Sequence, residues 1–318
     1  MRRVLFRRLT AALTVAAVAL TGCATRQPAP SPTTPAAADF PVEVSVPGGS
    51  TGLKLEKRPE RIISLNPSST EVLYAVGAGK QVVAVDDQST FPAEAPKTTL
   101  SGFKPNLEAI ANQKPDLVLA SNDIDNLVAG LGQLKIQVLL VPPAKTLDET
   151  FAQVSAVGKA TGHAAAGEAL AQRMRADIDK IVGETRKAVS SSGKPMSYYH
   201  ELDNSLYSVS SKTFVGHVYS RFGLVNIADE ADKSNSGYPQ LSAEYLVKAN
   251  PDLIFLADTK CCGQNAQTVA ARPGWQTVTA VKNNGVIALD DDIASRWGPR
   301  VVDLVRTVSS AVSAAAAK

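Results

Sequence analysis

The chain contains the stretch FKPNLEAIANQKPDLVLAS at residues 103–121 and a second stretch of the same pattern, YPQLSAEYLVKANPDLIFLAD, at residues 238–258. In each, a glutamate (Glu108, Glu244) lies eight residues before the aspartate of a Pro-Asp-Leu step, and an apolar run follows that step. Each stretch also begins with an aromatic residue. The copies lie too far apart for a solenoid repeat, so they indicate two similar lobes.

Short apolar runs alternate with helical patterns around these stretches. An apolar run at residues 61–65 precedes a helix that Ser68-Ser69-Thr70 can cap, and the next apolar run, at residues 81–85, follows a glycine-rich stop. Strands that alternate with helices indicate a parallel sheet with right-handed crossovers.

Residues 147–189 depart from this alternation. Apolar residues recur at helical spacing from Leu147 to Val157, a break follows at residues 161–163, and a long amphipathic helix without proline covers about 165–188. We therefore predict an α/β fold with two pseudo-symmetric α/β lobes, each with a parallel-type sheet, bridged by one long α-helix.

The N-terminus has the pattern of an export signal. Four arginines in the first eight residues precede an apolar run from Leu9 to Leu20, which is too short to span a bilayer but suits the core of a signal peptide. The following Leu20-Thr21-Gly22-Cys23 resembles a bacterial lipobox, which implies cleavage before Cys23 and lipidation of its thiol. An ordinary secretory signal with a chance cysteine is the alternative.

These patterns divide the chain into five segments. The residues after Cys23 are rich in Pro, Ala, Ser and Thr and bury too little apolar surface to fold alone, so they predict a flexible tether. The expected segments are a signal peptide at 1–22, the lipidated cysteine and tether at 23–57, an N-terminal lobe at 58–145, a linking helical segment at 146–192 and a C-terminal lobe at 193–318.

Charge and motifs exclude several classes of function. The chain has 33 basic and 30 acidic residues, and the four arginines of the signal account for the basic excess, so we expect no nucleic-acid partner. No HExxH or CxxC motif occurs, so we expect no protein-held metal and no cofactor. A secreted α/β hydrolase is the competing interpretation, but none of the three histidines lies in a recognisable catalytic motif.

Several parts of the chain together resemble the class III solute-binding proteins: the export signal and tether, RIISLNPSSTEVLYAVGAG at residues 61–79, the two paired stretches, and ARPGWQTVTAVKNNGVIALDDD at residues 271–292. The resemblance covers about residues 58–310. It implies a protein that is not an enzyme but binds cobalamin, a ferric siderophore or haem between two lobes bridged by a rigid helix. It also implies a lipid-anchored monomer on the outer face of the cell membrane, with an ABC permease and a separate ATPase subunit as partners.

The two-lobe arrangement predicts where a ligand binds. In open α/β sheets, ligands lie beyond the carboxyl ends of the strands, so two facing lobes direct their post-strand loops towards one cleft. The loops concerned are Asn66–Thr70, Asp86–Phe91, Ser121–Ile124, Tyr207–Thr213 and Asp258–Gln264.

The paired glutamates match positions that, in the family, dock against arginines of the permease. A charge on a helix is usually only a solvated residue, but a pair at equivalent positions of two lobes favours docking by Glu108 and Glu244, because two separated carboxylate–arginine contacts set register and orientation.

Ligand contacts are expected mainly from aromatic residues. Phe103 and Tyr238 match positions where cobalamin binders stack rings, although core packing is the general alternative for an aromatic side chain. Gln88 and Ser121 stand where those binders have aromatic residues, which leaves a siderophore or haem open beside the favoured corrinoid. The further expected contacts are Tyr207, Gln88, Arg296 and Trp297, with Arg296 either binding an anionic ligand group or pairing with neighbouring aspartates.

Two other features carry open alternatives. His200 follows a predicted strand, so it could reach the cleft as an axial ligand of cobalt or iron, although a structural histidine is the commoner case. Cys261 and Cys262 are adjacent cysteines in an oxidising compartment, which predicts either a vicinal disulfide or two free thiols.

Overall fold

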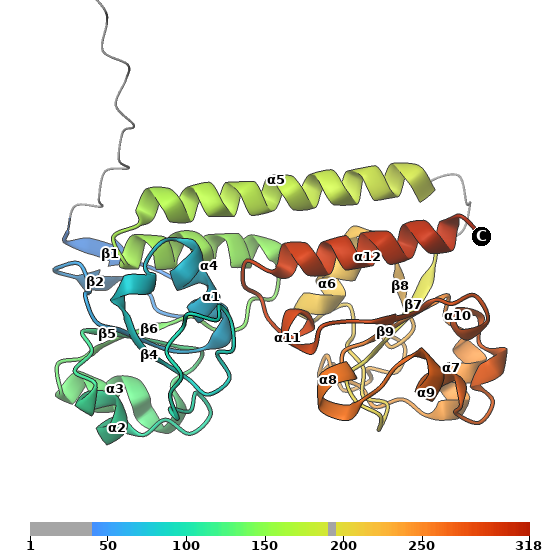
Figure 1. The fold of residues 1–318 in the computed structure, drawn as a ribbon, viewed down its shortest axis with the longest axis horizontal. Coiled ribbons are helices and arrows are strands. Elements are labelled where there is room, and N and C mark those ends of the chain that lie inside the picture. Colours follow the sequence, from blue (N-terminus) through green and yellow to red (C-terminus); the bar gives the residue numbers. More distant parts are fainter. Residues whose placement is uncertain (1–39, 190–194) are drawn as a thin grey trace, which may run out of the picture. The chain divides into compact units, whose positions relative to one another are not determined.

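The computed structural model describes residues 40–189 and 195–318 (Figure 1). The expected signal peptide at 1–22, the lipidated Cys23 and the first part of the expected tether lie outside the described residues. Within the described ranges, no helix has the length and apolar character that a membrane crossing requires.

The N-terminal lobe is built on a four-stranded parallel sheet with the order β4-β3-β5-β6. Alternate residues of β3 and β5 belong to two different hydrophobic clusters, one on each face, which explains why these strands are apolar throughout. The strands are β3 (Ile62–Leu65), β4 (Val82–Val85), β5 (Leu117–Ala120) and β6 (Gln137–Leu140), and the helices are α1 (Pro67–Ala75), α2 (Leu107–Asn112) and α3 (Leu127–Gln133).

The C-terminal lobe has a second four-stranded parallel sheet, with the order β10-β9-β7-β8. Two parallel sheets in one chain confirm the predicted fold class. The strands are β7 (Ser197–Glu201), β8 (Val225–Asn226), β9 (Leu253–Leu256) and β10 (Val286–Ala288), and the helices are α6 (Phe214–Arg221), α7 (Ala243–Ala249), α8 (Thr259–Cys262), α9 (Ala266–Ala270), α10 (Thr279–Lys282) and α11 (Asp291–Ala294).

The two Pro-Asp-Leu steps perform the same task in the two sheets. The Asp116 carboxylate accepts hydrogen bonds from the backbone N–H groups of Glu60 and Arg61, both at 3.0 Å, just before β3. The Asp252 carboxylate accepts one from the N–H of Ser197, the first residue of β7, at 2.8 Å. Each aspartate therefore ties the start of its own strand to the start of the neighbouring central strand, which accounts for the repeat.

The long helix α5 (Ala164–Val189) packs against α4 (Leu147–Ala160) and α12 (Val301–Ala316), which follow one another along its length in Figure 1. Its buried residues Ala171, Met174, Ile178 and Val182 recur at helical spacing, as the sequence predicted. One hydrophobic cluster runs from β3 and β5 through these helices to β7 and β9, so the helical layer shares its core with both sheets.

Residues 40–57 differ from the expected tether. They form an antiparallel hairpin of β1 (Val42–Val44) and β2 (Leu53–Leu55). Val42 and Val44 are buried against α4, and the turn residue Ser50 accepts a hydrogen bond from the Leu140 N–H at 2.8 Å. The folded part of the chain therefore begins before residue 58, because the alternating valines of this short strand bury one face.

Candidate ligand-binding site

A cavity of about 390 Å³ lies at the carboxyl ends of the N-terminal lobe's strands. Three of the predicted post-strand loops contribute to it, and the segment between α11 and α12 forms the opposite wall. This position agrees with the general rule for open α/β sheets. The lining residues are Leu65–Ser68 after β3, Asp86 and Gln88 after β4, Gly102 and Phe103, Ser121 and Asn122 after β5, Pro143 after β6, and Asp292 with residues 295–297.

Hydrogen bonds within the loops fix the cavity floor. The Asn66 side chain caps α1 by accepting from the Ser68 N–H at 2.8 Å, and its amide donates to the Val141 carbonyl at 3.2 Å. The loop after β3 is thereby held to the end of β6. Thr70 and Ser89 hydroxyls lie 2.8 Å apart, and Ser89 donates to the Asp86 carboxylate. Asn66, Thr70 and Asp86 are buried and Ser89 is half-buried, so the floor is preorganised without a ligand.

Arg296 joins the two walls of the cavity. Its guanidinium donates to Asp292 Oδ1 at 2.9 Å and to the Gln88 carbonyl at 2.9 Å, and lies 3.4 Å from Glu71 Oε1. Glu71 is buried in α1 and also pairs with Arg300 at 2.5 Å. Arg296 therefore pairs with a neighbouring aspartate, which is one of the two predicted alternatives. It also contacts a glutamate of the N-terminal lobe.

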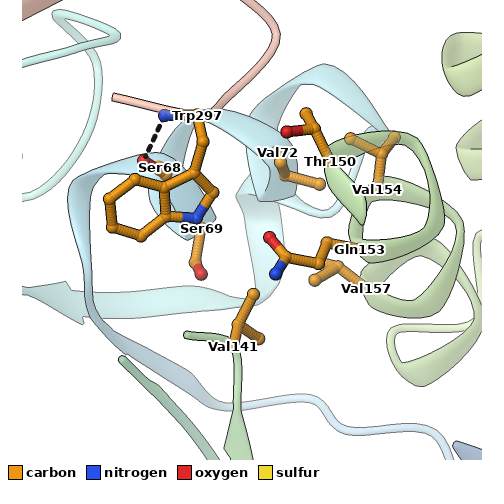
Figure 2. A pocket seen from close by; sticks show the side chains of 9 residues that line it. All are labelled: Ser68, Ser69, Val72, Val141, Thr150, Gln153, Val154, Val157 and Trp297. Carbon is orange, nitrogen blue, oxygen red and sulfur yellow. Dashed lines mark hydrogen bonds between the residues drawn. The ribbon is translucent and has the colours of Figure 1, made fainter. Parts of the chain in front are cut away.

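Trp297 lies between the cavity and the core of the N-terminal lobe. Its backbone N–H donates to Ser68 Oγ at 3.2 Å, and its indole ring lies beside Ser68 and Ser69 (Figure 2). The ring also borders a small hole of about 10 Å³ whose wall includes Val72, Val141 and Val154. The indole therefore combines a cavity-facing position with core packing.

The other predicted ligand contacts divide into those that line the cavity and those that do not. Phe103 lines the cavity with 73% of its surface exposed, and Gln88 lines it beside the Arg296 guanidinium. Tyr238 and Tyr207 are also exposed, at 55% and 40%, but neither lines this cavity. The structure therefore brings together Phe103, Gln88, Arg296 and Trp297 of the predicted ligand contacts.

Glu108 and Glu244 occupy matching positions on α2 and α7. Each lies exposed in the first turn of its helix, two residues after a side chain that caps it, Asn106 in one lobe and Ser242 in the other. In the described part of the chain, neither carboxylate forms an ion pair. Both are thus available to an external partner.

His200 does not reach the cleft. The ring is fully buried in β7, and its Nδ1 lies 2.9 Å from the Tyr219 hydroxyl. Burial lowers the pKa of His200 to about 3, so the ring stays neutral. An axial contact with a ligand metal, which the sequence left open, is therefore inconsistent with its position, because a strand residue points to one of two faces and this one faces the core.

The structure joins Cys261 and Cys262 by a disulfide at the end of α8, with a Cα–Cα distance of 3.8 Å. The Asp291 carboxylate accepts hydrogen bonds from the N–H groups of Lys260 and Cys261 at 2.9 and 3.0 Å. Lys260 in turn donates to Asp290 at 2.8 Å. The disulfide turn is therefore bonded to the segment that precedes the cavity wall. Within the described ranges, no group of three or more His, Cys, Asp or Glu side chains is arranged to hold a metal.

One motif of hydrolases occurs without its structural context. Gly48-Gly49-Ser50-Thr51-Gly52 has the Gly-x-Ser-x-Gly spacing, which in α/β hydrolases places a serine on a strand-to-helix turn. Here Ser50 lies in the turn of an antiparallel hairpin, and its Oγ accepts from the Leu140 N–H. The serine is therefore a structural acceptor.

Sequence reasoning missed two residues that shape the site. Asp86 was included only within a loop, although it directly follows β4 and is 3% exposed at the cavity. Glu71 was not among the predicted site residues. A carboxylate directly after a strand was a usable signal for Asp86, whereas the partner of Glu71 lies 225 residues away in the sequence.

Comparison with known proteins agrees with this geometry. The periplasmic binding protein family matches residues 62–293. The chain is 32% identical over 312 residues, 95% of each chain, to an uncharacterized ABC transporter substrate-binding lipoprotein, YvrC, of Bacillus subtilis. It is 29% identical over 282 residues to a cobalamin-binding protein of Halobacterium salinarum, covering 86% of this chain and 75% of that one.

A solved structure is similar to this chain in both sequence and fold. The vitamin B12-binding protein BtuF of Vibrio cholerae superposes with a TM-score of 0.66 at 28% identity, covering 81% of this chain and 98% of the other. The matched family segment contains both sheets and the cavity wall up to Ile293. The chain therefore belongs to the periplasmic binding protein family, as a non-enzymatic substrate-binding protein of an ABC importer.

Proposed function

We propose that this substrate-binding protein captures a corrinoid in the cavity beyond the N-terminal sheet. The observation that carries the proposal is the exposed Phe103 ring on the wall of a cavity that also presents the carboxamide of Gln88 and the indole of Trp297. A flat, amide-rimmed macrocycle offers an apolar face for stacking and donors at its edge for the polar loops. The cobalamin-binding and B12-binding relatives support this choice of ligand.

A ferric siderophore is the second candidate. Gln88 and Ser121 line the cavity at places where corrinoid stacking favours aromatic residues. Hydroxyl and carboxamide groups suit the many oxygen atoms of a siderophore, and ligand choice on this fold depends on few loop side chains. Haem is a third occupant of the same fold.

We further propose that Cys23 carries a lipid that anchors the protein at the outer face of the cell membrane. The lipobox-like Leu20-Thr21-Gly22-Cys23 and the lipoprotein relative of Bacillus subtilis support the anchor. The hairpin at residues 42–55 belongs to the folded part of the chain, which supports a tether confined to residues 24–39. Replacement of Cys23 by serine should move the protein from the membrane fraction to the soluble fraction; retention in the membrane would contradict the anchor.

Titration of the purified protein with a ligand panel tests the corrinoid assignment. The panel contains cyanocobalamin, cobinamide, haemin and ferrioxamine B, and binding is followed by calorimetry and by the visible absorption of each ligand. We expect one-to-one binding that is tightest for a corrinoid. Phe103→Ala should weaken it by about tenfold or more, whereas Leu134→Ala, an exposed apolar residue outside the cavity, should not. If ferrioxamine B or haemin bound most tightly, the corrinoid assignment would be wrong and that compound would represent the ligand class.

A further inference from the structure

The charged residues that line the cavity are two acids and one base: Asp86, Asp292 and Arg296. The balance between acids and bases therefore bears on which ligand charge the cavity accepts.

The single base of the lining is already neutralised. Arg296 is 9% exposed, and its guanidinium contacts the carboxylates of Asp292 at 2.9 Å and Glu71 at 3.4 Å. A ligand carboxylate would therefore have to compete with both of these carboxylates for the Arg296 guanidinium.

Two further bases beside the wall formed by residues 292–297 are engaged in the same way. Arg300 pairs with Glu71 at 2.5 Å, and Lys260 pairs with Asp290 at 2.8 Å and Asp292 at 3.3 Å. The cation groups around this wall are thus committed to carboxylates of the protein, and none of them is left for an anionic ligand.

Asp86 is different, because part of its carboxylate is available. The residue is 3% exposed; Oδ1 accepts from Ser89, and no side chain of the described part of the chain is hydrogen-bonded to Oδ2. A Cβ atom at Gly102 would lie 3.3 Å from this Oδ2 and 2.4 Å from the Leu65 carbonyl. No side chain therefore fits at position 102, and the carboxylate stays open towards the cavity.

We propose that Asp86 is a specificity-determining residue that makes the cavity select neutral or cationic metal complexes and reject anionic ones. The inference rests on the proposed ligand-binding role of the cavity and deepens it. A ligand amide or ammonium would donate to Oδ2, the open acceptor. A ligand carboxylate would meet the like charge of the buried Asp86 while the Arg296 guanidinium is already paired, which is unfavourable in a partly desolvated site.

Two matched ligand pairs separate charge from shape. The first pair is cobinamide and cobyric acid, corrinoids that differ in whether one ring substituent ends in an amide-linked alcohol or in a carboxylate. The second is ferrioxamine B, which ends in an ammonium group, and its N-succinyl derivative, which ends in a carboxylate. We expect the full-length protein to bind the amide or ammonium member about tenfold or more tightly in whichever pair it accepts, at pH 7.5.

The variant Asp86→Asn assigns this preference to one side chain. It should bring the two members of the pair to within about twofold of each other, mainly by strengthening the anionic member. Asp87→Asn is the matched control, because Asp87 is the exposed neighbouring carboxylate and does not line the cavity, and it should keep the full preference. If Asp86→Asn does not fold, Asp86→Ser gives the same comparison.

Each outcome has a distinct meaning. Equal binding within a pair, or tighter binding of the carboxylate member, overturns the charge selection but leaves the ligand-binding role intact. A preference that survives in Asp86→Asn overturns the assignment to Asp86. Absence of binding for all four compounds and for haemin contradicts the proposed function itself, and the inference falls with it.

Discussion

Asp258, at the carboxyl end of β9, is a buried acid whose two carboxylate oxygens have no hydrogen-bond partner in the described part of the chain. It lies beside the buried Glu201, which pairs in bidentate fashion with Arg272, both contacts at 2.6 Å. Burial, and then the Glu201 charge, raise the pKa of Asp258 to about 7. The folded protein therefore keeps a proton that the unfolded chain releases above about pH 4.

This proton predicts a pH-dependent effect of Asp258→Asn. Because the unfolded state binds fewer protons between the ordinary carboxyl pKa and the raised one, the wild-type free energy of unfolding should fall as pH rises through that window. Asparagine has the shape of the neutral acid and does not titrate. The variant should match the wild type near pH 4 and exceed its stability by about 1–3 kcal/mol at pH 8, as measured by urea unfolding. If wild type and variant had the same free energy of unfolding at pH 8 as well as at pH 4, the raised pKa of Asp258 would be contradicted.

For two residues, Arg296 and His200, the sequence could not predict the contacts of the side chain. Arg296 was open either to an anionic ligand group or to the neighbouring aspartates, because the sequence does not show which side chains of α1 lie near its guanidinium. The fold brings Glu71 to it from 225 residues away and removes the free charge. His200 was similarly open to two interpretations, because the sequence does not show whether a residue near the end of a strand lies within the buried sheet or beyond its edge.

At the scale of elements, most strands and helices of the two lobes were predictable. Apolar runs bounded by glycine, proline and capping residues specify β3, β5, β7 and β9. The structure adds that Asp116 joins the start of β5 to that of β3, and that Asp252 joins the start of β9 to that of β7. The hairpin β1–β2 was missed because its strands have three residues each and lie in a Pro- and Gly-rich region. Their stability comes from packing against α4, a tertiary contact that local composition does not report.

The site was predictable to the level of loops, not of side chains. The rule that ligands bind beyond the carboxyl ends of parallel strands predicted the loops after β3, β4 and β5, which line the cavity. It also predicted the loops Tyr207–Thr213 and Asp258–Gln264, which do not line it. It did not distinguish Phe103, which lines the cavity, from Tyr238, which does not, because their sequence contexts are equivalent. The lobes share a pattern, but among the described residues the cavity is lined by the N-terminal loops, Asp292 and residues 295–297.

At the scale of the whole molecule, the paired glutamates predict a division between binding and delivery. Glu108 and Glu244 are exposed, lie outside the cavity lining and occupy equivalent helices. The double variant Glu108→Lys, Glu244→Lys should bind ligand with unchanged affinity while cellular uptake falls by about tenfold or more, because carboxylate–arginine docking becomes like-charge repulsion.

The control for docking is Glu184→Lys, a charge reversal at an exposed position of α5, which should leave uptake near the wild-type level. Each single glutamate reversal should have an intermediate effect. Normal uptake by the double variant would show that these helices do not meet the permease.

The proposed function depends on where the ligand binds. The most direct measurement is a crystal structure of the protein with the tightest-binding compound of the panel. We predict one ligand beyond the N-terminal sheet, with Phe103 against its face and with contacts to Asp86, Gln88 and residues 295–297. A ligand bound elsewhere, with these residues still open to solvent, would contradict the account.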